Sequence, residues 1–360
     1  MLPWVSLAAV PPRLPRPTHV ALTLAFALAA ALAARALDMP LPWMLGPLFA
    51  TAAAGIAGAP LAASNRLRNV GQWVIGLALG LYFTPAVLAL IARLAPAIAF
   101  GVLWALVLGW GFHRFLLATN GGDRATAYFA AAIGGASEMA VLAERHGGQV
   151  DRVAAAHSLR VLLVVSIIPF GLQWSGLHGL DGTSPALAAV QPGGLALLLA
   201  ASAAGVALLR ALGAPNPFVL GALGAAVVFT AAGLPSSGLP PWASPMAQLF
   251  IGVSLGTRFT PEFLHAAPRW LGAVAAGTLA MIAVTAGFAW VLAVLAPMPL
   301  ATAILATAPG GIAEMAITAK VLQLGVPVVT AFQVVRYVAV LTLTAPLYRR
   351  ELARGTARAG

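Results

Sequence analysis

The sequence predicts an all-α integral membrane protein built from two copies of one helical unit. Of its 360 residues, 61% are hydrophobic and 8% are charged, whereas a soluble domain carries roughly 25% charged residues. Within a bilayer, backbone polar groups must be satisfied inside helices or closed barrels. Segments such as Ala21–Ala34 and Leu195–Leu209 are almost entirely apolar, which favours helices because barrel strands alternate apolar and polar residues.

Two motifs each occur twice and indicate an internal repeat. Ile75–Pro85 and Ile251–Pro261, whose first residues are 176 positions apart, share seven of eleven residues. The same separation aligns Gly134–Ala140 with Gly310–Ala316. Chance similarity between Ala-rich and Leu-rich helices would not keep one register through rare residues such as glutamate and proline, so we infer two copies of one unit.

The placement of basic residues indicates that the two copies are inverted in the membrane. Arg66 and Arg68 lie in a connection of the first copy whose counterpart, 235–245, carries no charge. Lysine and arginine mark cytoplasmic loops, so equivalent connections with different basic content are expected to face opposite sides. Arg258 and Arg269 fit this pattern poorly, and a parallel repeat is the alternative.

An inverted repeat needs an odd number of crossings in each copy. With about 20 residues for each crossing, we expect about ten transmembrane helices plus two short membrane helices. The short helices are expected near 70–83 and 246–258. The spans are expected near 18–37, 43–60, 96–116, 125–143 and 153–172 in the first copy, and near 194–212, 217–233, 270–296, 301–320 and 326–348 in the second.

These spans define the expected domain organisation. The chain divides into a cytoplasmic N-terminal tail (1–17), a first membrane repeat (18–172), a linker (173–193), a second membrane repeat (194–348) and a basic cytoplasmic tail (349–360). Both termini are thus expected on the cytoplasmic side of a bacterial inner membrane. The short helices carry Gly76-x-x-x-Gly80 and Gly252-x-x-x-Gly256, a spacing that permits close helix packing.

Glycine pairs interrupt one apolar stretch in each copy. Gly134-Gly135 and Gly310-Gly311 fall within expected spans, and each glycine in mid-helix is less favourable than alanine by about 1 kcal/mol. Pro309 removes a backbone donor as well. We predict broken helices, whose second halves begin after the glycines with free N–H groups and a positive dipole end. Discontinuous helices at equivalent places of two repeats point to the binding site of a transporter.

Glu138 and Glu314 follow the glycines at equivalent positions, and Ser137 precedes the first. A carboxylate at the membrane centre costs about 2.5–3.5 kcal/mol on insertion scales, so a matched pair suggests a use. The functional interpretation is a site for a proton, a cation or a substrate ammonium group where the repeats meet. The structural alternative is that each glutamate caps its own helix or packs against an arginine.

Arg160 and Arg336 lie on the helices that follow the glycine motifs. Each has a polar residue three positions earlier on the same helix face, His157 or Gln333. We expect the arginines to balance the glutamates or to hold an anionic substrate group. The alternative for Arg160 is a place near a cytoplasmic helix end, from which it would snorkel to water. His157 is either a group that titrates near neutral pH or a hydrogen-bonded structural residue.

Composition argues against several other classes. The absence of cysteine excludes disulfides, thiol catalysis and Cys-based metal sites. The six histidines are scattered, with no pair at i, i+3 or i, i+4, so we expect no metal site and no cofactor. The formal net charge of +11 fits membrane topology better than nucleic-acid binding, because the soluble pieces are too short for a DNA-binding domain.

The paired Ile-Gly-x-x-Leu-Gly-x-x-Phe-Thr-Pro and Gly-Gly-x-x-Glu-Met motifs, each followed by an arginine-bearing helix, resemble the AbrB family of bacterial membrane proteins. The resemblance covers about Val20 to Arg350. Members have been labelled ammonia monooxygenases and, later, membrane proteins involved in regulating gene expression. The name is shared with a soluble DNA-binding regulator whose fold this sequence does not show. The resemblance supplies no site residues.

The favoured function is a secondary transporter or exporter of a small solute, with a midplane site at the repeat interface. The alternative is a membrane protein that regulates gene expression indirectly and without transport, through its basic tail and a partner or anionic lipid. A membrane monooxygenase is less favoured, and we expect no enzymatic activity. The expected partners are the lipid bilayer and an unknown small solute or ion, with no direct nucleic-acid contact; a homo-oligomer is left open.

Overall fold

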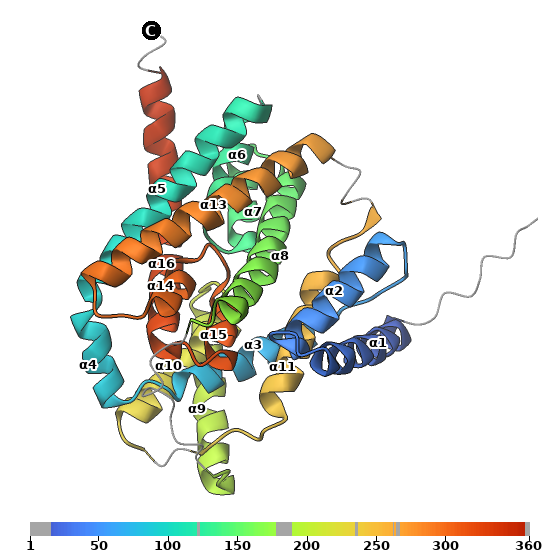
Figure 1. The fold of residues 1–360 in the computed structure, drawn as a ribbon, viewed down its shortest axis with the longest axis vertical. Helices are drawn as coiled ribbons and strands as arrows, with labels where there is room; N and C mark the ends of the chain where they lie inside the picture. Colours follow the sequence, from blue (N-terminus) through green and yellow to red (C-terminus); the bar gives the residue numbers. More distant parts are fainter. Residues whose placement is uncertain are drawn as a thin grey trace, which may run out of the picture.

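The computed structural model describes residues 16–120, 123–177, 189–234, 237–261, 263 and 267–356. Across these ranges the chain forms α-helices and no β-strand (Figure 1). The first half contains α1 (Arg16–Ala36), α2 (Pro42–Ile56), α3 (Asn65–Gly80), α4 (Pro85–Arg93), α5 (Ala95–Asn120), α6 (Arg124–Ala131), α7 (Ala136–Arg145) and α8 (Val150–Ser175). The second half contains α9 (Pro192–Ala211), α10 (Pro217–Ala231), α11 (Ala243–Gly256), α13 (Pro268–Leu295), α14 (Leu300–Thr307), α15 (Ile312–Val321) and α16 (Val326–Thr356).

Six of the described helices, α1, α5, α8, α9, α13 and α16, are long and apolar enough to cross a membrane. The number rises to seven if α3 and α4, which are bent by 88° relative to each other, form one broken span. Large apolar side chains cover the outer surface: Trp110, Trp290 and Val294 keep 57%, 61% and 69% of their area exposed. An apolar surface of this kind marks contact with lipid or another protein. The fold is therefore that of a helical membrane protein.

Local sequence signals explain several helix starts. Pro42 and Pro217 occupy the first turns of α2 and α10, where a missing N–H costs nothing. Asp123 caps α6, because its carboxylate oxygens accept hydrogen bonds from the backbone N–H groups of Ala125 and Thr126, both at 3.0 Å. These caps satisfy amides that have no partner within the helix.

Helices of the two halves occupy equivalent sequence positions, and several of them pack on helices of the opposite half. α3 ends at Gly80 and α11 at Gly256, and α7 begins at Ala136 and α15 at Ile312; both pairs are 176 residues apart. α3 packs on α10 while α11 packs on α2, and α8 packs on α13 while α16 packs on α5. The halves are therefore interlocked and do not form separate domains.

The glycines of α3 and α11 lie where helix backbones cross. A Cβ atom on Gly76 would collide with the carbonyl oxygen of Val219, and one on Gly252 would collide with that of Met44. Val219 and Met44 are themselves equivalent positions of the two halves. The close packing expected from the glycine spacing is present in both copies, and it fixes α3 against α10 and α11 against α2.

The chain ends differ from the expected boundaries. α16 extends to Thr356 and does not stop near 348, because its last turns pack against α5, where His113 Nε2 and Glu351 Oε1 lie 3.1 Å apart. The first part of the basic tail is thus helical. α8 continues to Ser175 and α9 begins at Pro192, whereas most of the expected linker and of the N-terminal tail lies outside the described residues.

Candidate functional site

In each half the glycine motif separates two short helices. α6 ends at Ala131 and α7 begins at Ala136, and α14 ends at Thr307 and α15 begins at Ile312. The stretches at 125–143 and 301–320 are thus each a pair of half-helices, and the helix breaks predicted at the glycine pairs are confirmed. Extended backbone at the breaks is tolerated at membrane depth only where it is buried in protein or lines a cavity.

The second glycine of each pair leaves room for a glutamate side chain. Gly135 and Gly311 are the N-cap residues of α7 and α15. The space that a Cβ would need there is filled by the carboxylate Oε2 of Glu138 and of Glu314, respectively. Each carboxylate therefore folds back over the first turn of its own half-helix, where the positive end of the helix dipole stabilises negative charge.

Arg160 and His157, both on α8, bind the carboxyl end of the first half-helix in their copy. Arg160 Nη1 donates to the Ala130 carbonyl oxygen at 3.2 Å, and Arg160 Nη2 lies 2.8 Å from His157 Nδ1. Since arginine only donates, His157 Nδ1 is the acceptor, and the proton is on Nε2, which donates to the Phe129 carbonyl oxygen at 2.9 Å. This arrangement requires a neutral His157.

Arg336 and Gln333, both on α16, bind the equivalent end of α14. Arg336 donates to the carbonyl oxygens of Ala308 and Gly310, and to Gln333 Oε1. Gln333 Nε2 donates to the Leu305 carbonyl oxygen at 2.8 Å. The last carbonyls of a helix lack intrahelical partners and carry partial negative charge, so a buried guanidinium at this place is well compensated.

The arginines and glutamates thus face different helix ends. Within the described ranges no ion pair joins Arg160 or Arg336 to a glutamate; the arginines contact the ends of α6 and α14, and the glutamates cover the starts of α7 and α15. The snorkelling alternative for Arg160 is wrong, because only 2% of this residue is exposed.

A polar cavity of about 380 Å³ lies between the two breaks. It brings together almost all residues that the sequence singled out; they are Gly134, Gly135, Ser137, Glu138, His157, Arg160, Pro309, Gly310, Gly311, Glu314 and Arg336. Gln333 is fully buried and lies behind Arg336, outside the lining. The cavity has the size of a small-molecule site.

Six residues of this lining with polar side-chain groups were missed by the sequence analysis. They are Arg68, Asn69 and Gln72 of α3, Asn216 just before α10, Arg258 just after α11, and Tyr337 of α16. One signal was available: Arg258 did not fit the distribution of basic residues expected for cytoplasmic loops. Its neighbours in the lining come from distant parts of the sequence, and no motif groups them.

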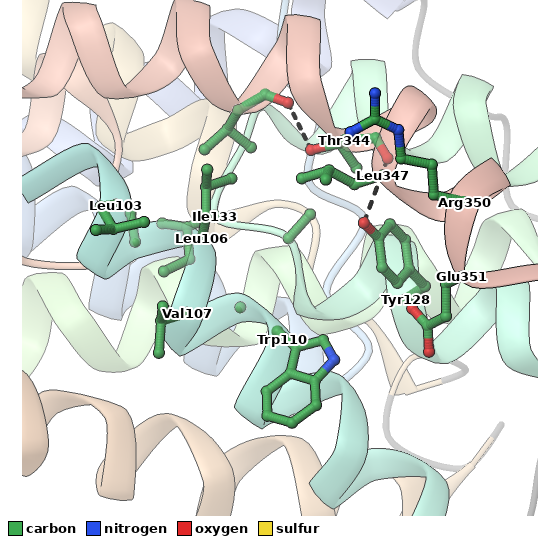
Figure 2. A pocket seen from close by; sticks show the side chains of 14 residues that line it. Leu103, Leu106, Val107, Trp110, Tyr128, Ile133, Thr344, Leu347, Arg350 and Glu351 are labelled. Atoms are coloured by element: carbon green, nitrogen blue, oxygen red, sulfur yellow. Dashed lines mark hydrogen bonds between the residues drawn. The ribbon is translucent and has the colours of Figure 1, made fainter. Parts of the chain in front are cut away.

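A second, mainly apolar cavity of about 430 Å³ lies beside α5, α6 and α16. Figure 2 shows Leu103, Leu106 and Val107 on one side of it, with Tyr128, Arg350 and Glu351 at the other. The Tyr128 hydroxyl donates to the Thr344 carbonyl oxygen at 3.3 Å. This cavity contains none of the repeated motif residues, so the polar cavity is the candidate site.

The donor types in the polar cavity do not suggest a metal. Among the described residues there is no group of three or more His, Asp or Glu side chains that could hold a metal ion. Four arginines and two glutamates line the cavity. Such a set can bind a charged organic or inorganic solute and can exchange protons through its carboxylates.

Comparison with known proteins gives the family. The family model described as "Transition state regulatory protein AbrB" matches residues 43–351. The chain is 28% identical over 307 residues to "Uncharacterized protein YhjN" of Bacillus subtilis (strain 168), covering 79% of each protein. It is 26% identical over 321 residues to "Putative regulator AbrB" of Escherichia coli (strain K12), covering 88% of this chain and 91% of that protein. No solved structure matches. Since the family model spans most of the chain, the protein belongs to the AbrB family.

Proposed function

We propose that this protein is a secondary transporter or exporter that moves a small solute through the polar cavity. One observation carries the proposal: half-helices from equivalent positions of the two copies, α7 and α15, begin at the same polar cavity. Broken helices that meet at a midplane site, with helix ends directed at the solute, are the usual construction of repeat-based transporters.

The proposed topology has ten crossings in two inverted repeats. Six are the long helices; α2 and α10 would be two short crossings, and the pairs α6–α7 and α14–α15 would be two broken ones. Each broken pair covers a stretch close to the roughly 20 residues that a crossing needs. The directions of equivalent helices support inversion: in Figure 1, α5 rises away from α4, whereas α13 descends along the same diagonal.

We propose that both termini are cytoplasmic and that the membrane is the bacterial inner membrane. Arg349, Arg350 and Arg354 make the end of α16 basic, as expected for a cytoplasmic segment. The domain boundaries of the proposal are those given by the repeat, except that α16 carries the second copy to Thr356. The proposal assigns no enzymatic chemistry and no direct contact with nucleic acid.

In the proposed mechanism the two kinds of charged residue have separate tasks. Arg160 and Arg336 hold the helix breaks in shape by binding their carbonyl groups. Glu138 and Glu314 respond to the coupling ion, because a carboxylate that covers a helix start can be released when it takes up a proton or a cation. Rocking of one repeat against the other would then open the cavity to alternate sides.

The proposal is tested by solute and ion flux in proteoliposomes, comparing the wild type with the double variant Glu138→Gln/Glu314→Gln. Glu144→Gln is a matched control, because Glu144 is also on α7 and is exposed to the outside. Flux that is lost in the double variant and kept in the control supports transport through this cavity. Flux unchanged by the double substitution contradicts it.

A regulatory role without transport is the second candidate, favoured by the name of the E. coli relative, "Putative regulator AbrB". The basic end of α16 would then contact a partner or anionic lipid. Removal of residues 351–360 should abolish the regulatory phenotype while the protein still inserts in the membrane. A phenotype that survives this truncation counts against a tail-mediated role.

A further inference from the structure

The charged groups of the polar cavity differ in whether the protein supplies a compensating partner for their charge. Arg160 and Arg336 each donate to carbonyl oxygens at a helix break. Glu138 and Glu314 each lie over the first turn of a half-helix. These four residues therefore have compensating groups of opposite charge or dipole within the protein itself.

Arg68 and Arg258 have no such compensation. No hydrogen bond joins either guanidinium to another residue in the part of the chain that the structure describes, whereas the Nη atoms of Arg160 and Arg336 donate to carbonyl oxygens. The two arginines are close enough to repel each other, and Glu314 is the carboxylate within electrostatic range of both. These two positive charges share one carboxylate in a partly buried site, so one positive charge remains without a counter-charge.

The unbalanced positive charge of these two arginines lies where α3 packs on α11. Arg68 is on α3 and Arg258 follows α11, and these two helices pack on each other. At the equivalent positions of the other copy stand Ser244 and Tyr82. A structural requirement of the repeat would appear in both copies, so the pair is an asymmetric addition to the repeated glycine and glutamate motifs.

The groups around the two arginines are those that recognise anions. Asn69 and Gln72 add side-chain amides from α3, and Ser137 adds a hydroxyl from the first turn of α7. The positive dipole ends of α7 and α15 also face the cavity, and each becomes available to an anion when the glutamate that covers it moves away. The planar guanidinium fork suits carboxylate and phosphate oxygens in particular.

We infer that the polar cavity binds a small anion carrying a carboxylate or phosphate group, with Arg68 and Arg258 as its main ligands. The inference names the substrate class of the proposed transport site and so rests on the proposed function. Glu314 competes with the anion for the same two guanidiniums. Anion binding is therefore favoured when Glu314 moves away or takes up a proton, and in the second case the solute is coupled to a proton.

The test is a binding measurement on the full-length protein in lipid nanodiscs. Acetate, succinate and inorganic phosphate serve as anionic probes, and ammonium and methylammonium serve as cationic probes, at matched ionic strength. Calorimetry and thermal unfolding report binding. The anions are expected to bind and stabilise the wild type, and the cations are not; this comparison needs no variant.

Variants then locate the site. Arg258→Tyr and Arg68→Ser introduce the residues that stand at the equivalent positions of the other copy. Each should weaken anion binding by about tenfold or more, because each removes a charge-assisted hydrogen bond. The exposed Arg35 of α1 gives the control Arg35→Ser, which should bind like the wild type. Anion binding that both site variants retain overturns the inference.

The outcomes separate this inference from the proposed transport function. Anion binding that depends on Arg68 and Arg258, without any flux, would leave the anion site standing and remove the transporter. Flux of a cation or neutral solute, lost in Glu138→Gln/Glu314→Gln and indifferent to Arg258→Tyr, would keep the transporter and overturn the anion site. Absence of binding by all three anions to the wild type also overturns it.

Discussion

Arg336 on α16 donates a hydrogen bond of 2.7 Å to the main-chain carbonyl of Gly310, inside the break between α14 and α15. Through this bond a charged residue of one helix fixes the shape of another helix at the point where its own hydrogen bonding stops. Arg160 makes the equivalent type of contact with Ala130 at the end of α6. The two breaks are thus built structures and not local disorder of the helix.

Replacing Arg336 by methionine should destabilise the fold. The substitution leaves the carbonyls of Ala308 and Gly310 buried without this donor, at a cost of roughly 2–5 kcal/mol. Thermal unfolding in detergent should therefore occur at a lower temperature. Arg350→Met, in the same helix but at its basic end, is the control. Equal melting of the Arg336 variant and the control would show that the guanidinium does not hold the break.

A methyl group at the helix break should disturb function more than stability. In Gly135→Ala or Gly311→Ala the new Cβ takes the space of the Glu138 or Glu314 carboxylate, so the carboxylate must leave the start of its half-helix. We expect flux to fall while the protein remains folded. Gly287→Ala in α13, where a Cβ meets nothing within 4 Å, is the control. Full flux in both break variants would contradict the assigned position of the carboxylates.

Alanine at the close helix contacts of α3 and α11 should reduce stability more than function. Gly76→Ala and Gly252→Ala push a Cβ against the carbonyl oxygens of Val219 and Met44, and such overpacking costs about 1–3 kcal/mol. The two variants should lose similar stability because the contacts are equivalent. The control is again Gly287→Ala. A large loss in one variant with none in the other would argue against the two-fold arrangement of α3 and α11.

The absence of cysteine permits a direct test of inversion. Arg145 and Val321 are equivalent positions at the ends of α7 and α15, and both are exposed. If the copies are inverted, single cysteines at these positions should react with a membrane-impermeant thiol reagent from opposite sides of the membrane. Reaction from the same side for both would indicate a parallel repeat.

Glu314→Gln should increase the affinity for an anion, since it removes the charge that competes for Arg68 and Arg258. The direction is informative: a cation site would lose affinity with the same substitution. Titration calorimetry with succinate compares the variant with the wild type, and Glu144→Gln controls for a change of charge elsewhere on the protein. Weaker succinate binding in Glu314→Gln would contradict the assignment of Glu314 as a competitor.

The features that could be predicted from the sequence are those that occur in both copies of the repeat. The paired Gly-Gly-x-x-Glu-Met motif located both helix breaks, because glycine pairs and glutamate are rare in apolar helices. Arg160 and Arg336 were found for the same reason, although their partners were not. Main-chain carbonyls leave no trace in a sequence, so an arginine that binds them cannot be told from one that binds a glutamate.

The asymmetric part of the site, Arg68 and Arg258, could not be predicted from the sequence. Arg68 resembles any basic residue of a loop, and Arg258 appeared only as an exception to the expected charge distribution. They become neighbours because α3 packs on α11, a contact between segments far apart in the chain. Among the expected spans, those of α2 and α10 are described as helices of 15 residues each, and length alone does not identify them as crossings.

The measurement that tests the account most directly is ion and solute flux in proteoliposomes under imposed pH and sodium gradients, with anionic probes inside and outside. We predict gradient-driven flux in the wild type and in Glu144→Gln, and its loss in Glu138→Gln/Glu314→Gln. Well-folded wild-type protein that shows neither current nor counterflow of the probes, or a double variant that transports like the wild type, would contradict transport through this cavity.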